Sequence, residues 1–205
     1  MSTRSRCMLS PILLGFVVGC SETVEPGPES SPSPDQTVAA KEADVALEIL
    51  DYEGIINRIE GYKGRVVVVD VWATSCVPCL KEFPGLVALH KKYDRNDVMC
   101  VSVSLDFEGL KGTSPQDDHE RVLDYLRRFQ AKFDNILAGD DADMMYEKLA
   151  LAAPPAVYVY DRSGKLVKRF DNEQVRGDEE GFTYKDVGRL VARLAAETPP
   201  GVQEQ

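Results

Sequence analysis

Two cysteines separated by two residues, Cys76 and Cys79, are the side chains whose spacing most directly predicts chemistry. They follow a valine-rich run over residues 66–71 and precede a helical pattern of apolar residues. A CxxC pair between a buried strand and the start of a helix is typical of a redox-active dithiol. At a helix N-terminus the unpaired N–H groups and the helix dipole favour a thiolate. We therefore expect the pKa of Cys76 to lie below the usual value of about 8.5.

The same pair could instead ligate zinc or form an inert structural disulfide. Zinc would need two further ligands; His90 and His119 are the only histidines, and Cys20 and Cys100 are the remaining thiols once the predicted signal is removed. We interpret Cys100 as a small buried residue of a strand and both histidines as surface residues. The redox interpretation is favoured, and we expect no metal and no other cofactor.

The predicted elements alternate between strands and helices. Residues 66–71 hold five valines in six positions, which indicates a strand buried on both faces of a helix-covered sheet. The helix that carries the dithiol begins near Pro78, bends at Pro84 and extends to about Tyr93. The other predicted strands are 45–49, 98–105, 135–137, 156–160 and 166–170, and the other helices are 52–59, 115–131, 142–149 and 184–196. This order predicts an α/β sandwich with a parallel part and a terminal hairpin.

The first twenty residues predict a targeting signal. Arg4 and Arg6 precede an apolar segment that is too short for a convincing membrane span. The segment ends at Cys20 and resembles the lipobox of bacterial lipoproteins, which implies cleavage before Cys20 and lipidation of its thiol. An ordinary signal peptide or an uncleaved anchor is the alternative. We expect a signal peptide at 1–19, a lipidated and disordered tether at 20–41, a folded domain at 42–197 and a disordered tail at 198–205.

From residue 43 to residue 196 the chain resembles the TlpA/ResA-like thiol-disulfide oxidoreductases of the thioredoxin superfamily. The motifs that carry the resemblance are WAT at 72–74, CVPC at 76–79, KEFP at 81–84, a proline at 155 ahead of a strand, and a helix and strand inserted over 115–137. The resemblance implies a thioredoxin-like three-layer α/β/α sandwich with a mixed sheet and a TlpA-type αβ insertion. Two positions depart from the family. Ser75 replaces a second tryptophan, and Pro154 lacks the N–H that usually binds peptide substrate before the cis-proline.

The resemblance also implies a role for each residue of the site. Cys76 would attack the disulfide of a client, and Cys79 would resolve the mixed disulfide. Asp70 matches the buried acid of thioredoxin, which would accept the proton of Cys79. A strand-end carboxylate held by backbone donors is the alternative. The predicted substrate-binding residues are Trp72 (chiefly as the floor of the site), Ser75, Pro78, Pro154 and Pro155.

Together these features predict an enzyme: a monomeric, membrane-anchored reductase of protein disulfides on the periplasmic side of a bacterial membrane. Its partners would be protein thiols and disulfides, and a membrane thiol-electron donor that recharges it. The net charge of −10 is a poor match for nucleic acid. A copper-handling protein of the same fold is an alternative, although that group carries CxxxC and a distant histidine. A docking protein with vestigial thiols is another, favoured by Ser75 and Pro154.

Overall fold

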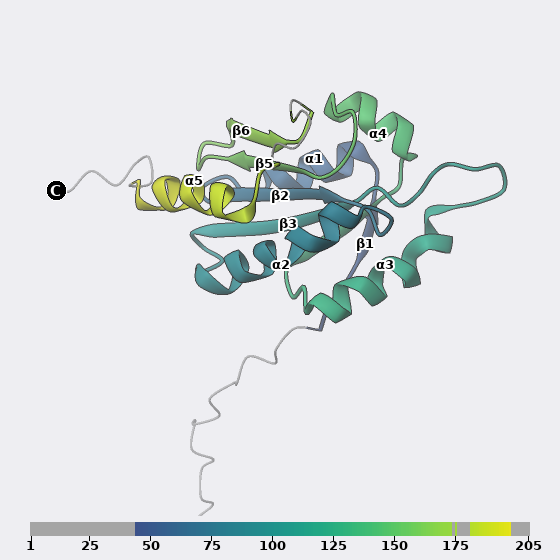
Figure 1. Cartoon of the computed structure of the whole chain (residues 1–205), viewed down its shortest axis with the longest axis horizontal. Helices are drawn as coiled ribbons and strands as arrows, with labels where there is room; N and C mark the ends of the chain where they lie inside the picture. The colour runs from purple at the N-terminus through teal and green to yellow at the C-terminus, as the bar shows by residue number, and fades with distance from the viewer. Residues whose placement is uncertain (1–43, 174, 176–180, 198–205) are drawn as a thin grey trace, which may run out of the picture. The chain divides into compact units, whose positions relative to one another are not determined.

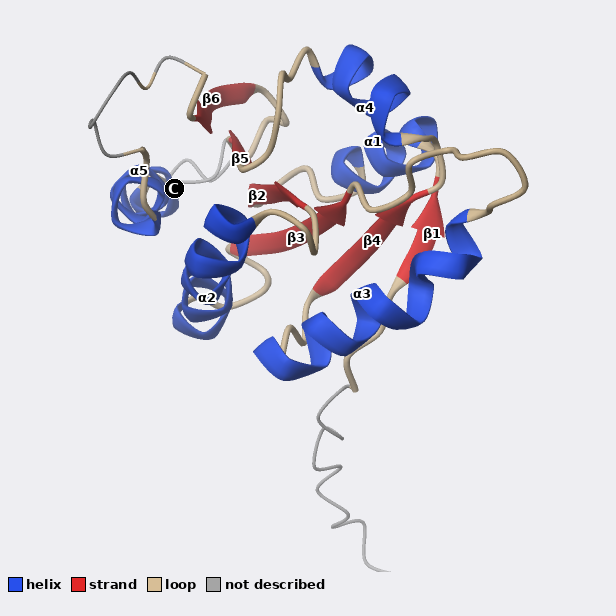
Figure 2. Cartoon of the chain, turned by 45° about the vertical axis from the view of Figure 1, so that its right-hand side comes forward, coloured by secondary structure: helices blue, strands red, loops and turns tan. Residues whose placement is uncertain are grey.

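The centre of the sheet consists of β-branched residues that are buried on both faces. In the computed structural model, which describes residues 44–173, 175 and 181–197, β2 (Val66–Trp72) and β3 (Val98–Ser104) are buried along their whole length. They lie inside a six-stranded sheet of order β1-β4-β3-β2-β5-β6 (Figures 1 and 2). The other strands are β1 (Glu48–Leu50), β4 (Asp134–Ala138), β5 (Ala156–Tyr160) and β6 (Leu166–Asp171).

The sheet is mixed, as predicted. Strands β1, β4, β3 and β2 pair in parallel, whereas β5 pairs antiparallel with β2 and β6 pairs antiparallel with β5. The carboxyl ends of the parallel strands therefore share one edge of the sheet. In open α/β sheets this edge is where ligands and reacting groups are usually held.

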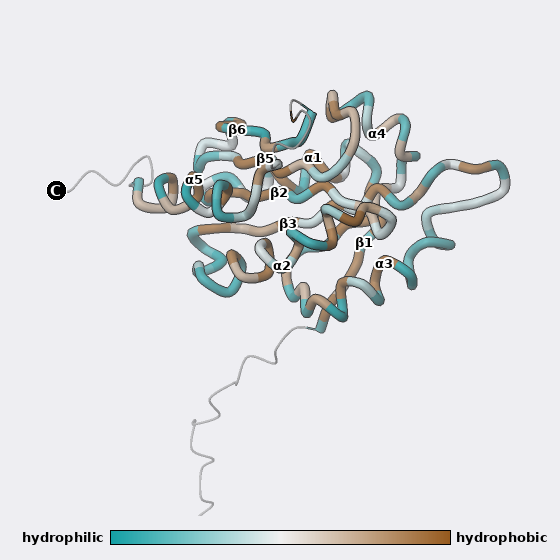
Figure 3. The backbone as a smooth tube through the Cα atoms, viewed as in Figure 1, coloured by the Kyte–Doolittle hydropathy of each residue, from teal (hydrophilic) through white to brown (hydrophobic). Residues whose placement is uncertain are grey.

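Helices cover both faces of the sheet. The alternation of β2 assigns its residues to two separate apolar clusters, because successive side chains of a strand point to opposite faces. The first cluster joins Val66, Val68 and Trp72 to α2 (Val77–Lys92), α3 (Pro115–Phe129) and α5 (Tyr184–Ala196). The second joins the odd-numbered residues of β2 to α1 (Tyr52–Glu60) and α4 (Ala142–Leu149). The predicted three-layer sandwich is confirmed, and Figure 3 shows hydrophilic colour on the outer turns of the helices.

The first strand is shifted from its predicted position at 45–49. Only Glu48–Leu50 has a partner strand, which is β4. Before it, the carbonyl of Ala46 accepts a hydrogen bond from the Asn135 amide at 3.1 Å, and that of Leu47 lies 3.1 Å from the Nε2 atom of His119. Side chains thus hold this backbone in place of a strand. The predicted end of α3 at residue 131 is also too late, because Gln130 adopts a left-handed conformation that ends the helix.

The predicted insertion consists of α3 and β4, and it widens the sheet because β4 joins β3 to the edge strand β1. The predicted signal peptide, the tether with Cys20 and the C-terminal tail lie outside the described residues. Among the helices that the structure describes, none has the length and apolar character needed to cross a membrane.

Candidate active site

The two cysteines lie at the carboxyl edge of the sheet, at the start of α2. Cys76 is the N-cap residue of this helix, and its sulfur accepts a hydrogen bond from the backbone N–H of Cys79 at 3.2 Å. The two sulfurs are joined in a disulfide. Cys76 is half-buried whereas Cys79 is 3% exposed. An outer sulfur at a helix N-terminus backed by a buried one is the arrangement that thiol-disulfide exchange requires.

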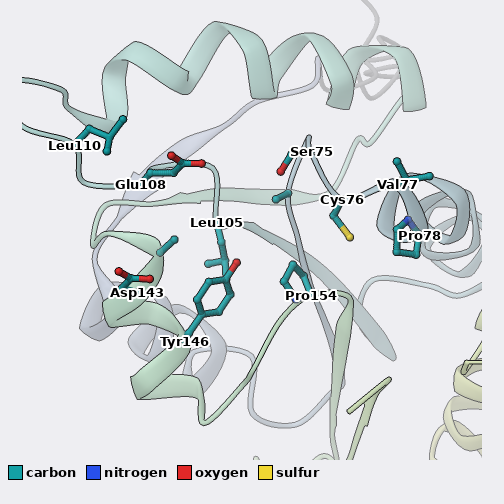
Figure 4. A pocket seen from close by; sticks show the side chains of 12 residues that line it. Ser75, Cys76, Val77, Pro78, Leu105, Glu108, Leu110, Asp143, Tyr146 and Pro154 are labelled. Atoms are coloured by element: carbon teal, nitrogen blue, oxygen red, sulfur yellow. The ribbon is translucent and has the colours of Figure 1, made fainter. Parts of the chain in front are cut away.

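The predicted substrate-binding residues differ in exposure. Ser75 and Pro78 are exposed beside the dithiol, and Pro154 is half-buried. The Pro154–Pro155 peptide bond is cis, as the resemblance implied. Pro154 lines the same cavity as Cys76, and in Figure 4 the sulfur of Cys76 lies between Pro154 and Pro78. These residues form a rim around the outer sulfur.

Trp72 does not belong to this rim. Its side chain is fully buried and packs against Phe83, with the ring centroids 4.9 Å apart. Direct contact between the Trp72 ring and a client is therefore excluded in this conformation, which corrects its assignment as a substrate-contacting residue. Trp72 belongs to the same apolar cluster as Cys79, and its role as the floor of the site stays a prediction.

Asp70 lies on the face of β2 that packs against α2 and α5. Its neighbours at alternate positions, Val68 and Trp72, belong to the apolar cluster that includes Cys79. Burial raises the pKa of Asp70 to about 7, opposed by a hydrogen bond from Tyr184 and assisted by the negative charge of Glu82. A carboxyl group with this pKa can both accept and release a proton near neutral pH.

Tyr184 was not predicted as part of the site. It is the first residue of α5, and its hydroxyl donates to a carboxylate oxygen of Asp70, while its backbone N–H donates to Glu82 at 3.1 Å. The side chain can come this close because Gly85 lies opposite it on α2, where a Cβ atom would overlap the Cβ and ring of Tyr184. The partner of Asp70 is thus a side chain, not the backbone donors of the alternative interpretation.

A second buried carboxylate holds the turn before the dithiol. Asp106, two residues after the end of β3, accepts hydrogen bonds from the Thr74 backbone N–H at 3.0 and 3.1 Å and from the hydroxyls of Thr74 and Ser104. Arg121 of α3 lies 2.6 Å from the same carboxylate and also donates to Thr74. The cluster fixes the backbone two residues before Cys76. Its sequence signal is an acid at the carboxyl end of a central parallel strand.

Cys100 is chemically separate from the dithiol. It is fully buried within β3, as predicted, and burial raises its pKa to about 12. It therefore remains a protonated thiol at neutral pH. His90 and His119, which we interpreted as surface residues, are both half-buried. Within the described part of the chain, no group of three or more His, Cys, Asp or Glu residues is placed to hold a metal ion.

Comparisons with known proteins identify proteins that are similar to this chain in sequence. A family model described as redoxin matches residues 43–186. The thiol-disulfide oxidoreductase ResA of Bacillus cereus is 25% identical over 137 residues, which cover 67% of this chain and 72% of that protein. The chloroplastic protein SUPPRESSOR OF QUENCHING 1 of Arabidopsis thaliana is 30% identical over 118 residues, which cover 57% of this chain and 10% of that protein.

Solved structures share the fold. A thiol-disulfide isomerase from Corynebacterium glutamicum aligns with a TM-score of 0.53 at 21% identity, over 77% of this chain and 99% of that chain. A thioredoxin-like superfamily protein aligns with a TM-score of 0.52 at 18% identity, over 68% of this chain and 86% of that chain. These likenesses confirm the predicted thioredoxin-like fold.

Proposed function

This chain belongs to the redoxin family and is a thiol-disulfide oxidoreductase, and we propose that it reduces disulfide bonds of client proteins outside the cytoplasm. The observation that carries the proposal is the half-buried Cys76 sulfur, bonded to a buried Cys79 at the start of α2 and open to a cavity. The reducing direction is supported by Asp70, which supplies a proton acceptor on the face of β2 that Cys79 packs against.

The proposed reaction starts from the reduced dithiol. The Cys76 thiolate attacks one sulfur of a client disulfide; a bond forms between the two proteins, and the client's second sulfur leaves as a thiolate that takes a proton from water. Cys79 then gives its proton to Asp70 and attacks the Cys76 sulfur. This step releases the client's first thiolate and forms the Cys76–Cys79 disulfide. Two electrons pass from the dithiol to the client, so a dithiol donor must recharge the protein.

We also propose that the protein is a lipid-anchored monomer at a bacterial membrane and that a membrane thiol-electron donor recharges it. The support is the sequence of residues 1–20, with two arginines, a short apolar segment and Cys20. Replacement of Cys20 by serine should move the protein from the membrane fraction to the soluble fraction and remove the mass of the lipid. An unchanged membrane association would contradict lipidation at this residue.

The experiment that tests the reductase activity is covalent trapping. In Cys79→Ser the resolving thiol is absent, so mixed disulfides through Cys76 should accumulate and survive an acid quench followed by alkylation. Cys76→Ser is the matched control, because its buried remaining thiol should trap no client. If Cys79→Ser traps no partner and the purified wild-type protein cannot reduce a model protein disulfide, the proposed function is wrong.

A further inference from the structure

A cavity of about 750 Å³ opens beside the outer sulfur (Figure 4). Its volume falls within the range of roughly 300–1,000 Å³ that is usual for ligand pockets. One side is formed by Cys76 and its neighbours and by Pro154; the other is formed by the loop after β3 and the start of α4. A client whose disulfide reaches Cys76 must therefore place neighbouring residues against that loop and helix.

The loop and the helix are held together in a fixed register. The backbone N–H of Ala142, the first residue of α4, donates to the carbonyl of Phe107 at 2.8 Å. Gly109 has a φ of +69°, and a Cβ atom there would lie 2.6 Å from the Cβ of Asp141. This close approach allows the loop to pack on the helix N-cap. It places Glu108 of the loop and Asp143 of the helix on the same wall of the cavity.

This wall carries two negative charges; Arg121 lines a neighbouring cavity with Glu108 but is ion-paired with Asp106 and Asp118. Glu108 and Asp143 are exposed, and neither forms an ion pair with another described residue. None of the residues that line the cavity is Lys, Arg or His. The pKa of Tyr146 is raised, mainly by burial of its ring and further by nearby negative charges that include Asp143 and Glu108. Both carboxylates of the wall therefore act electrostatically on Tyr146. The cavity therefore favours a cationic group over an anionic one.

The same cavity also has an apolar rim. Val77, inside the CVPC motif, is 75% exposed, and Leu110 at the tip of the loop is 62% exposed. They are among the few large apolar side chains that the described part of the chain exposes to this degree. Large apolar side chains that are exposed next to polar residues are typical of surfaces that bind other proteins.

We propose that this cavity, which we name the acidic client groove (Cys76, Val77, Glu108, Leu110, Asp143 and Tyr146), binds an extended client segment that has Lys or Arg close to its disulfide cysteine. The inference rests on the proposed reductase function and adds the class of client. The cationic side chain lies against Glu108 and Asp143, and apolar client residues contact Val77 and Leu110. The client's disulfide sulfur is then presented to Cys76.

The test uses three synthetic peptides that contain one internal disulfide and differ only in the residue beside the first cysteine, which is Lys, Gln or Glu. The rate constant for oxidation of the reduced, purified protein is measured with each peptide. At low ionic strength the Lys peptide should react about tenfold faster than the Glu peptide, since two largely exposed charges each contribute a modest factor. At high salt the three rates should converge, because exposed charges are screened.

Variants of the protein test whether the acidic client groove causes the preference for the Lys peptide over the Glu peptide. Glu108→Gln combined with Asp143→Asn should abolish the difference between the Lys and Glu peptides, and Glu108→Lys combined with Asp143→Lys should reverse it. Glu147→Gln, an exposed change on α4 outside the groove, is the control and should keep it. Equal rates for all three peptides with the wild-type protein would overturn the inference and leave the reductase function intact. If the wild-type protein reduces none of the three peptides, Cys79→Ser traps no partner and the protein also cannot reduce a model protein disulfide, the proposed function itself is wrong.

Discussion

Replacement of Asp70 by asparagine tests how strongly burial destabilises this carboxylate. The side chain is 4% exposed, and its pKa rises from the ordinary value of 3.8 to about 7. Between these two pH values the folded protein holds a proton that the unfolded chain has lost. Stability therefore falls as pH rises through this window and is constant above it. A difference of about three pH units corresponds to a loss of about 4 kcal/mol at high pH.

Asparagine keeps an oxygen that can accept the Tyr184 hydroxyl and has no charge to desolvate. The oxidised Asp70→Asn protein should therefore be more stable than the wild type. The difference in free energy of unfolding between the two proteins, which we call the gap, should grow with pH. From about pH 5 to about pH 8.5 the gap should widen by about 2.5 kcal/mol. Any fixed cost of burying the new NH₂ group is the same at both pH values and cancels. The measurement is urea unfolding of both proteins across this range.

Asp124→Asn is the matched control, because it removes an exposed carboxylate on α3 that is 59% accessible. Its stability relative to the wild type should change little with pH. If the gap for Asp70→Asn stays constant or narrows as pH rises, Asp70 is not a desolvated carboxylate with a raised pKa. Its role as the proton acceptor for Cys79 would then lose its physical basis.

Three further substitutions test the contacts that hold the residues of the site in position. Tyr184→Phe removes a hydrogen bond that favours the carboxylate of Asp70, so the pKa of Asp70 should rise by about one to two pH units in an NMR titration. Gly85→Ala should lower the free energy of unfolding by about 1–3 kcal/mol, because the added methyl group overlaps Tyr184. Asp106→Ala leaves the buried N–H of Thr74 unpaired. The free energy of unfolding, measured in urea, should therefore fall by about 3 kcal/mol.

Each substitution has a control of the same type. Tyr93→Phe, at the opposite end of α2, should leave the pKa of Asp70 unchanged. Gly188→Ala in α5 should be neutral or stabilising, because its Cβ would meet only Leu89 at 3.9 Å. Asp118→Ala removes only the outer partner of Arg121 and should change stability by less than about 1 kcal/mol. If a control variant has as large an effect as its test variant, the contact assigned to the test residue does not explain the effect.

The parts of the site that lie close together in the sequence could be predicted. The dithiol, the strand before it and the helix after it form one local unit, and the alternation of β2 sets the face on which Asp70 lies. The parallel core was predictable for the same reason, since a run of valines buried on both faces identifies a central strand. The first strand was misplaced because its limits depend on a partner, β4, that is distant in the sequence.

The contacts that tune the site could not be predicted, because they join distant residues. Tyr184 is 114 residues from Asp70, and no local pattern distinguishes it from other tyrosines. Arg121 likewise reaches Asp106 only once α3 has packed beside the sheet. One signal was available. Gly85 lies inside a helix, where glycine costs about 1 kcal/mol relative to alanine, and such a position often marks a close approach by another element.

The contact between Tyr184 and Asp70 makes the redox centre depend on the order in which the chain is made. The dithiol and its strand lie in the first half of the sequence, whereas α5 is the last helix of the described residues. A chain that has emerged only as far as β6 has both thiols but lacks the phenol that holds Asp70. Its cysteines can form a disulfide before Asp70 has its hydrogen-bond donor, Tyr184. Docking of α5 is therefore the event that completes the hydrogen bond to the buried carboxyl group on the strand before the dithiol.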